Sequence, residues 1–136
     1  MSWKVRLMIM RPIKFRAWYK PTNKLLCSNA VESINFETKV IGAYFEYAGY
    51  KQLRMSDFEI MQFTGLKDCN GKEIYEGDIV SYESVYIDPI IGGTQIKKVM
   101  FSSGEFHPEG VSGWGHSGTV KVIGNIYENP ELMEHE

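Results

Sequence analysis

The sequence holds few of the residues that build specialised scaffolds. Among its 136 residues are two cysteines, five prolines and three histidines. Cys27 and Cys69 are too few and too far apart for a disulfide framework, and reduced thiols are expected. No apolar run approaches the roughly 20 residues of a membrane span. These absences exclude a disulfide-stapled or membrane-spanning chain, and the length fits a single domain of about 100 to 200 residues.

The opening residues also lack the features of an export signal. Lys4 and Arg6 precede a short apolar stretch, but Arg11 and Pro12 follow at once. A signal peptide would need a longer apolar region and a cleavage site of small residues. We therefore expect a cytoplasmic protein that has no membrane partner.

Charge is balanced overall but unevenly distributed. The formal net charge is −2, yet the first 24 residues hold seven of the 15 basic residues and no acid. The other 112 residues hold the remaining eight basic residues and all 17 acids. This asymmetry indicates either pairing between a basic N-terminal strand and an acidic remainder, or a nucleic-acid-binding surface. Composition leaves both interpretations open.

Period-two alternation of side chains predicts a mainly β fold. Between residues 11 and 20, one face would carry Ile13, Phe15, Ala17 and Tyr19, and the other Lys14, Arg16, Trp18 and Lys20. Such alternation is typical of a strand with two unlike faces. Further strands are expected within 25–36, 39–47, 58–64, 79–86, 95–101 and 119–127. Short strands at about ten-residue spacing indicate a small β-barrel or sandwich.

Two turns stand out in the middle of the chain. Asn70-Gly71 predicts a type I′ hairpin turn, because both residues tolerate a positive φ. Gly77 would let the chain bend into the next strand. The carboxylate of Asp78 would then accept hydrogen bonds from amides of its own turn.

Glycine and proline also predict the form of the C-terminal third. Residues 107–118 contain four glycines and are expected to be a long loop. Gly124 would kink the last strand pair. Asn129 and Pro130 would cap and begin a short C-terminal helical turn.

Groups able to carry chemistry are scattered along the chain. The histidines are His107, His116 and His135, and they show no HxH or HxxxH spacing. The two cysteines form no CxxC motif. Glu73, Glu76 and Asp78 lie closer together, but carboxylates on a hairpin are more often turn and surface residues than acid/base pairs. We expect no metal, no cofactor and no enzymatic activity.

Three blocks of the sequence resemble the YopX family, whose proteins are encoded by phages and prophages. The blocks are residues 11–18 (RPIKFRAW), 61–80 (MQFTGLKDCNGKEIYEGDIV) and 122–132 (VIGNIYENPEL), in the family's order. The signature positions, which we interpret as structural, are Trp18, Gly65, Asn70, Gly71, Gly77, Asp78, Gly124, Asn125, Asn129 and Pro130.

The resemblance implies a fold and a division of the chain. The fold would be an SH3-like barrel with an N-terminal β extension and a short C-terminal helical turn. Met10 would be the natural start, so that residues 1–9 are an extension and 10–136 a single domain. Within that domain, 10–50 would form the N-terminal β part and 51–136 the barrel. The family has no established enzymatic activity, so the resemblance adds no catalytic residue.

Two functional hypotheses follow. The first is a phage- or prophage-encoded accessory protein of the bacterial host cell that self-associates and binds a host or phage protein, since SH3-like barrels expose edge strands and aromatic grooves. In this case the apolar residues 5–10 would add a strand to a neighbour. The alternative is a nucleic-acid-binding protein that uses the basic, aromatic N-terminal strand. The candidate binding residues are Lys14, Arg16, Trp18, Lys20 and, on the glycine-rich loop, Trp114.

Overall fold

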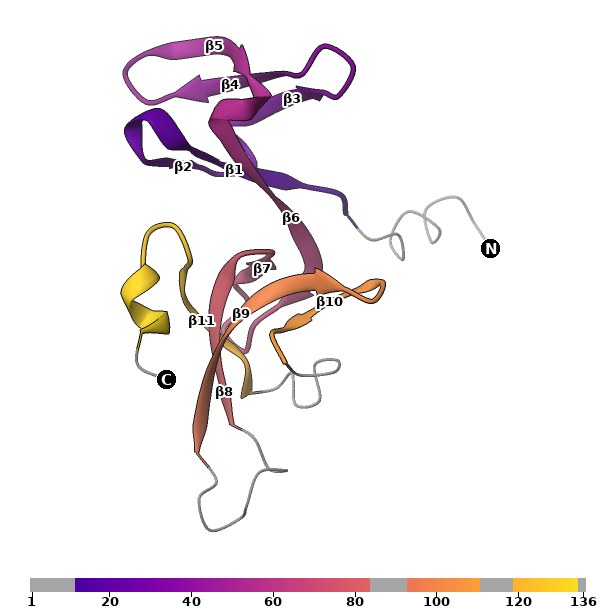
Figure 1. Cartoon of the computed structure of the whole chain (residues 1–136), viewed down its shortest axis with the longest axis vertical. Coiled ribbons are helices and arrows are strands. Elements are labelled where there is room, and N and C mark those ends of the chain that lie inside the picture. The colour runs from indigo at the N-terminus through magenta and orange to yellow at the C-terminus, as the bar shows by residue number, and fades with distance from the viewer. Residues whose placement is uncertain (1–11, 84–92, 111–118, 135–136) are drawn as a thin grey trace.

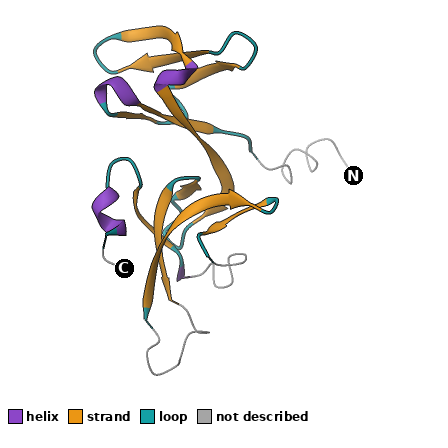
Figure 2. Ribbon diagram, viewed as in Figure 1, coloured by secondary structure: helices purple, strands orange, loops and turns teal. Residues whose placement is uncertain are grey.

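The computed structural model describes residues 12–83, 93–110 and 119–134 (Figure 1). Within these ranges the chain forms short strands and single 3-10 turns, with no α-helix (Figure 2). The mainly β prediction is therefore confirmed. No helix in the described part has the length and apolar character that crossing a membrane would require.

The strands follow one another with short connections. They are β1 (Phe15–Tyr19), β2 (Lys24–Leu26), β3 (Val31–Asn35), β4 (Val40–Phe45), β5 (Gly49–Arg54), β6 (Phe58–Lys67), β7 (Glu73–Tyr75), β8 (Asp78–Glu83), β9 (Thr94–Ser102), β10 (Glu105–Pro108) and β11 (Lys121–Asn125). The 3-10 turns are η1 (Lys20–Thr22), η2 (Met55–Asp57) and η4 (Pro130–Met133).

These strands form three antiparallel sheets, with the orders β3-β4-β5, β2-β1-β6-β7 and β10-β9-β8-β11. Figure 1 shows β1 to β5 in the upper half of the molecule and β7 to β11 in the lower half. The sheet β10-β9-β8-β11 in the lower half is strongly curled. The long strand β6 runs from one half to the other. It pairs first with β1 and then with β7.

The boundary expected near residue 50 can be compared with the strands around it. The boundary expected at residue 50 falls inside β5, which pairs with β4 from Gly49 to Arg54. The chain passes from the upper half to the lower half only along β6. β5 is not among the expected strands: it begins at Gly49, soon after the strand expected within 39–47.

The upper half has a core built from four strands and their neighbours. Its buried residues are Ala17 of β1, Leu26 of β2, Ile41 and Ala43 of β4, and Phe58 of β6. Tyr19 packs its ring against Phe45 and Phe58, with ring centroids 5.1 and 4.9 Å away. The predicted apolar face of β1 is thus the face turned toward this core.

The lower half has a separate core of small apolar residues. Ile74, Val80, Val99, Val120 and Val122 are buried together, with the half-buried Tyr82 against them. Because these residues come from β7, β8, β9, β11 and the residue before β11, the curl of the sheet is what brings them together.

The turn at Asn70-Gly71 differs from the prediction. A type I′ turn needs positive φ at both central residues, but here Gly71 has a φ of 81° and Asn70 is not left-handed. The cause is Asp68, whose Oδ1 accepts the N–H groups of Asn70 and Lys72, both at 2.9 Å. The pair with two positive φ values is instead Ser103 (53°) and Gly104 (80°), between β9 and β10.

Three expectations for the C-terminal third are also corrected. His107 and Pro108 belong to β10 rather than to a loop that begins at 107, because β10 pairs with β9. The last strand pair is a single strand, β11, whose register shifts between Val122 and Gly124 where a kink was expected. The side chain of Asn129 makes no cap bond to η4. It accepts the N–H of Asn125 at 3.2 Å.

Candidate functional site

The polar face of β1 is turned toward the lower half of the molecule. Lys14, just before β1, forms an ion pair with Glu73 of β7. Lys20, just after β1, lies 3.4 Å from a carboxylate oxygen of Glu59. Two of the predicted binding residues therefore face carboxylates, which matches the pairing interpretation of the uneven charge.

Arg16 is the third basic residue of this face and is buried. Only 8% of its surface is exposed, so Lys14, Arg16 and Lys20 do not form one exposed stripe. Arg16 Nη2 donates to Asp78 Oδ1 at 2.7 Å. The guanidinium carbon lies 4.8 Å from the centre of the Tyr75 ring. Among the described residues, Arg16 Nε has no hydrogen-bond partner.

Asp78 is almost fully buried, with 1% of its surface exposed. Its Oδ2 accepts the N–H of Tyr75 at 2.7 Å, which confirms the prediction that Asp78 bonds to an amide of its own turn. Burial raises the pKa of the Asp78 carboxyl, although Arg16 and the Tyr75 N–H oppose that rise. The predicted candidate Arg16 and the predicted signature residue Asp78 therefore meet in one buried ion pair.

Trp18 completes this junction. Its ring stacks on Tyr127, with centroids 5.6 Å apart and planes 18° apart. Burial raises the pKa of the Tyr127 hydroxyl. Neither Tyr127 nor Tyr75 was expected to contact β1, because no sequence pattern reports which residues a strand face will meet more than 50 positions later.

Other signature residues hold or permit particular backbone conformations. Asn125 Oδ1 accepts the N–H groups of Tyr127 and Glu128, at 3.0 and 2.8 Å. A side chain on Gly124 would collide with Asn129. Gly65 and Gly77 have φ values of 89° and 87°, which glycine adopts readily.

One residue of this kind was missed. Asp68 is buried, and its Oδ2 accepts the N–H of Val122 at 2.9 Å in addition to the two turn amides on its Oδ1. Asp68 lies two residues before Asn70 in the sequence, and an acid two residues before a turn amide is a known turn-forming pattern.

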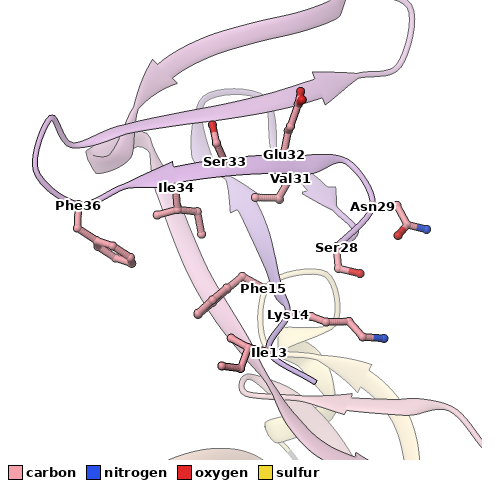
Figure 3. A pocket seen from close by; sticks show the side chains of 10 residues that line it. All are labelled: Ile13, Lys14, Phe15, Ser28, Asn29, Val31, Glu32, Ser33, Ile34 and Phe36. Atoms are coloured by element: carbon pink, nitrogen blue, oxygen red, sulfur yellow. The ribbon is translucent and has the colours of Figure 1, made fainter. Parts of the chain in front are cut away.

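A second candidate site is a groove between β1 and β3 in the upper half (Figure 3). Its volume is about 410 Å³, and its lining residues are Ile13, Lys14, Phe15, Ser28, Asn29, Val31, Glu32, Ser33, Ile34 and Phe36. We call it the β3 groove. In Figure 3, Ile34 and Phe36 extend from β3 and its end toward Phe15 and Ile13, while Glu32 points away from them.

The apolar residues of the β3 groove are unusually accessible. Ile13 is 70% exposed and Phe36 is 61% exposed. β3 is also an outer strand of its sheet, and in the described part of the chain it pairs only with β4. The groove therefore combines an apolar lining with a strand edge that has main-chain groups to offer. Sequence reasoning assigned it no role.

Another hollow of about 390 Å³ lies at the opposite end of the upper half, between the β1–β2 and β4–β5 connections. Its lining includes Lys24, Lys51 and Glu46 as well as apolar residues. Two of the strands that line it, β2 and β5, are outer strands of their sheets as well.

The one histidine in the described ranges, His107, lies away from both hollows. His107 lies 2.5 Å from Ser102 Oγ through Nε2, and 2.8 Å from the Pro108 carbonyl oxygen through Nδ1. These residues sit on the β9–β10 hairpin, outside the linings of both hollows. No group of three metal-ligating side chains occurs in the ranges that the structure covers. His116, His135 and Trp114 lie outside the described residues.

Comparison with known proteins places this arrangement in a family. The YopX protein family model matches residues 14–134, which is nearly the whole chain. The chain belongs to the YopX family. The matched region includes both the buried Arg16–Asp78 pair and the β3 groove, apart from Ile13.

One solved structure supports the fold of this YopX protein. The chain is similar to the crystal structure of protein EF1440 from Enterococcus faecalis, with 26% sequence identity and a TM-score of 0.65. The similarity covers 91% of this chain and 99% of that chain. Comparison with curated proteins gives no match.

Proposed function

We propose that this YopX-family chain is an accessory binding protein that self-associates and holds an extended segment of a protein in the β3 groove. In agreement with the family resemblance, we propose that it is encoded by a phage or prophage and has no enzymatic activity. The observation that carries the proposal is the exposed apolar lining of this groove beside an edge of β3 with which no described strand pairs.

Both features of the groove favour an extended peptide. Exposed apolar surface contributes about 25 cal/mol per Å² when a partner covers it, and Ile13 and Phe36 are mostly exposed. An outer strand such as β3 can pair with an added strand, which supplies affinity through the main chain and specificity through alternate side chains. A compact ligand would use the lining but leave the edge unpaired.

We further propose that the lower half is an SH3-like barrel, as the family resemblance implies. The support is its set of short antiparallel strands, its curl and its small apolar core. In this scheme the barrel and the buried Arg16–Asp78 pair form a scaffold that holds β1 in place as one wall of the groove.

Selection of random extended peptides against the immobilised protein tests the binding proposal. Selected peptides should carry apolar residues at alternate positions and should lose at least tenfold in affinity for Phe36→Glu and Ile13→Glu. Tyr47→Glu is the matched control, because Tyr47 is 99% exposed and lies outside the groove. Failure to select any peptide against both the wild type and the Leu7→Glu variant, or equal losses in all three variants, would refute the proposal.

Nucleic-acid binding through β1 is the weaker proposal. It rests on the basic and aromatic residues of this strand, but Lys14, Arg16 and Lys20 each face a carboxylate. We expect no binding of single- or double-stranded DNA or RNA at low salt, where phosphate contacts are strongest. Fluorescence anisotropy with labelled oligonucleotides measures this, and salt-sensitive binding that Lys20→Glu abolishes would reverse the order of the two proposals.

A further inference from the structure

We infer that the occupant of the β3 groove is residues 5–10 of a second copy of this chain. The inference rests on the proposed function, because it names the segment that the groove holds. It would make the groove the site of a reciprocal strand exchange between two copies.

The first argument is position. The described chain begins at Pro12, and Ile13 already lines the β3 groove. The eleven residues before Pro12 lie outside the described part. The segment that precedes Ile13 therefore starts at the rim of this groove, and two copies that meet groove to groove would bring each segment beside the partner's groove.

The second argument is the pattern of these residues. In an extended strand, Val5, Leu7 and Ile9 fall on one face, and Arg6, Met8 and Met10 fall on the other. Six residues in extended form span about 20 Å at roughly 3.3 Å each. This length suits β3, a strand of five residues, and three apolar side chains on one face suit the lining around Ile34 and Phe36.

The third argument favours a second copy over the chain's own start. Arg11 precedes Pro12, and a residue before proline is biased toward extended backbone. Pro12 itself has a restricted φ. The link to Ile13 is therefore biased against the immediate reversal that would return residues 5–10 to their own groove. Exchange of the same segment in both directions closes a two-fold dimer.

The mass of the full-length protein in solution, measured by light scattering, provides the first test. We expect the wild type to have the mass of two chains, and Leu7→Glu and Phe36→Glu to have the mass of one. Met8→Glu is the matched control, since Met8 lies on the other face of the predicted strand, and it should remain dimeric. A monomeric wild type, or a dimer that survives both Leu7→Glu and Phe36→Glu, would overturn the inference.

Cross-linking provides the second test and distinguishes the two sources of the segment. After Cys27 and Cys69 are replaced by serine, a Leu7→Cys chain is mixed with a Phe36→Cys chain and treated with a short bismaleimide. We expect a cross-link between the two different chains. A double variant that instead links within one chain, at the mass of a monomer, would show that the protein's own segment fills the groove.

Failure of this inference differs from failure of the proposed function. If Leu7→Glu protein still binds the selected peptides and loses them on Phe36→Glu, the groove binds a foreign segment and only the inference fails. If no peptide binds to Leu7→Glu protein, whose groove would be empty, both fail.

Discussion

Buried polar side chains make some of the contacts that join the most distant parts of this sequence. Arg16 and Asp78 are 62 positions apart, and Asp68 bonds to an amide 54 positions away. In each case an ionised or polar group lies away from water and is compensated by a specific partner, since an unpaired buried charge costs several kcal/mol. These residues therefore specify which strands meet.

The buried pair predicts an asymmetric response to mutation. Asp78→Asn should lower the free energy of unfolding by about 3 to 5 kcal/mol, because it leaves the Arg16 guanidinium buried without a counter-charge. Urea denaturation measures the change. The double variant Arg16→Met/Asp78→Leu removes both charges and should recover most of the loss. Equal losses in the single and double variants would contradict this account.

Asp68 predicts a dependence of stability on pH. Burial alone would raise the pKa of this carboxyl, but the N–H groups of Val122, Lys72 and Asn70 outweigh it and hold the pKa below its usual range. The ionised form is thus favoured in the folded state. Its contribution is present above the unfolded value of about 3.9 and is lost as the pH falls through the folded value.

Asp68→Asn should therefore be less stable than the wild type by about 1 to 3 kcal/mol at pH 7. The difference should shrink as the pH is lowered from 5 toward 2, since the wild type also loses its carboxylate there. Unfolding free energies measured across this range check the prediction. A difference that stays constant with pH would mean that the Asp68 charge contributes nothing.

At the scale of elements, β11 shows how a single glycine shapes a strand. The register of β11 shifts between Val122 and Gly124. A Cβ on Gly124 would lie 2.5 Å from Asn129 Oδ1, although the backbone there is not left-handed. This glycine is therefore required by the close approach of a side chain, whereas Gly71 is required by its positive φ.

Gly124→Ala should lower the free energy of unfolding by about 1 to 3 kcal/mol through this overlap. In an Asn129→Ala background the same substitution should cost much less, because the colliding atom is gone. Thermal unfolding of the two single variants and the double variant gives the coupling energy. A cost that does not change with residue 129 would place the effect in the backbone of β11 instead.

Elements were predictable where one face meets a core. β1 and β6 both alternate, and each was expected from its pattern. β5 was missed because only Leu53 of its six residues faces inward, so it has almost no alternation to detect. The turn at Asn70-Gly71 was placed correctly but given the wrong type, since the Asp68 side chain competes for its amides.

At the scale of the whole molecule, two small cores are held together by β6 and by the polar face of β1. Lys14, Arg16 and Trp18 contact Glu73, Asp78 and Tyr127 in the lower half. Neither half buries a large core by itself. The junction is therefore a substantial part of what stabilises each half.

This predicts that both halves unfold in one transition. Amide hydrogen exchange at rising urea should show that protection of Ile41 in the upper core and Val99 in the lower core is lost together. Trp18→Ala removes the stack on Tyr127. It should lower the free energy of this shared unfolding transition, or split it into separate transitions of the two cores. Two distinct transitions in the wild type would mean that the halves are independent.

Local patterns in the chain were enough to determine the mainly β class, several strands, the inward face of β1 and the bend at Gly77, because each depends on near neighbours. The tertiary structure alone decided the partners of the basic strand, the buried state of Arg16 and the existence of the β3 groove. These depend on which of many distant carboxylates, rings and edges a strand meets. Such pairing is set by packing of the whole chain rather than by spacing along it.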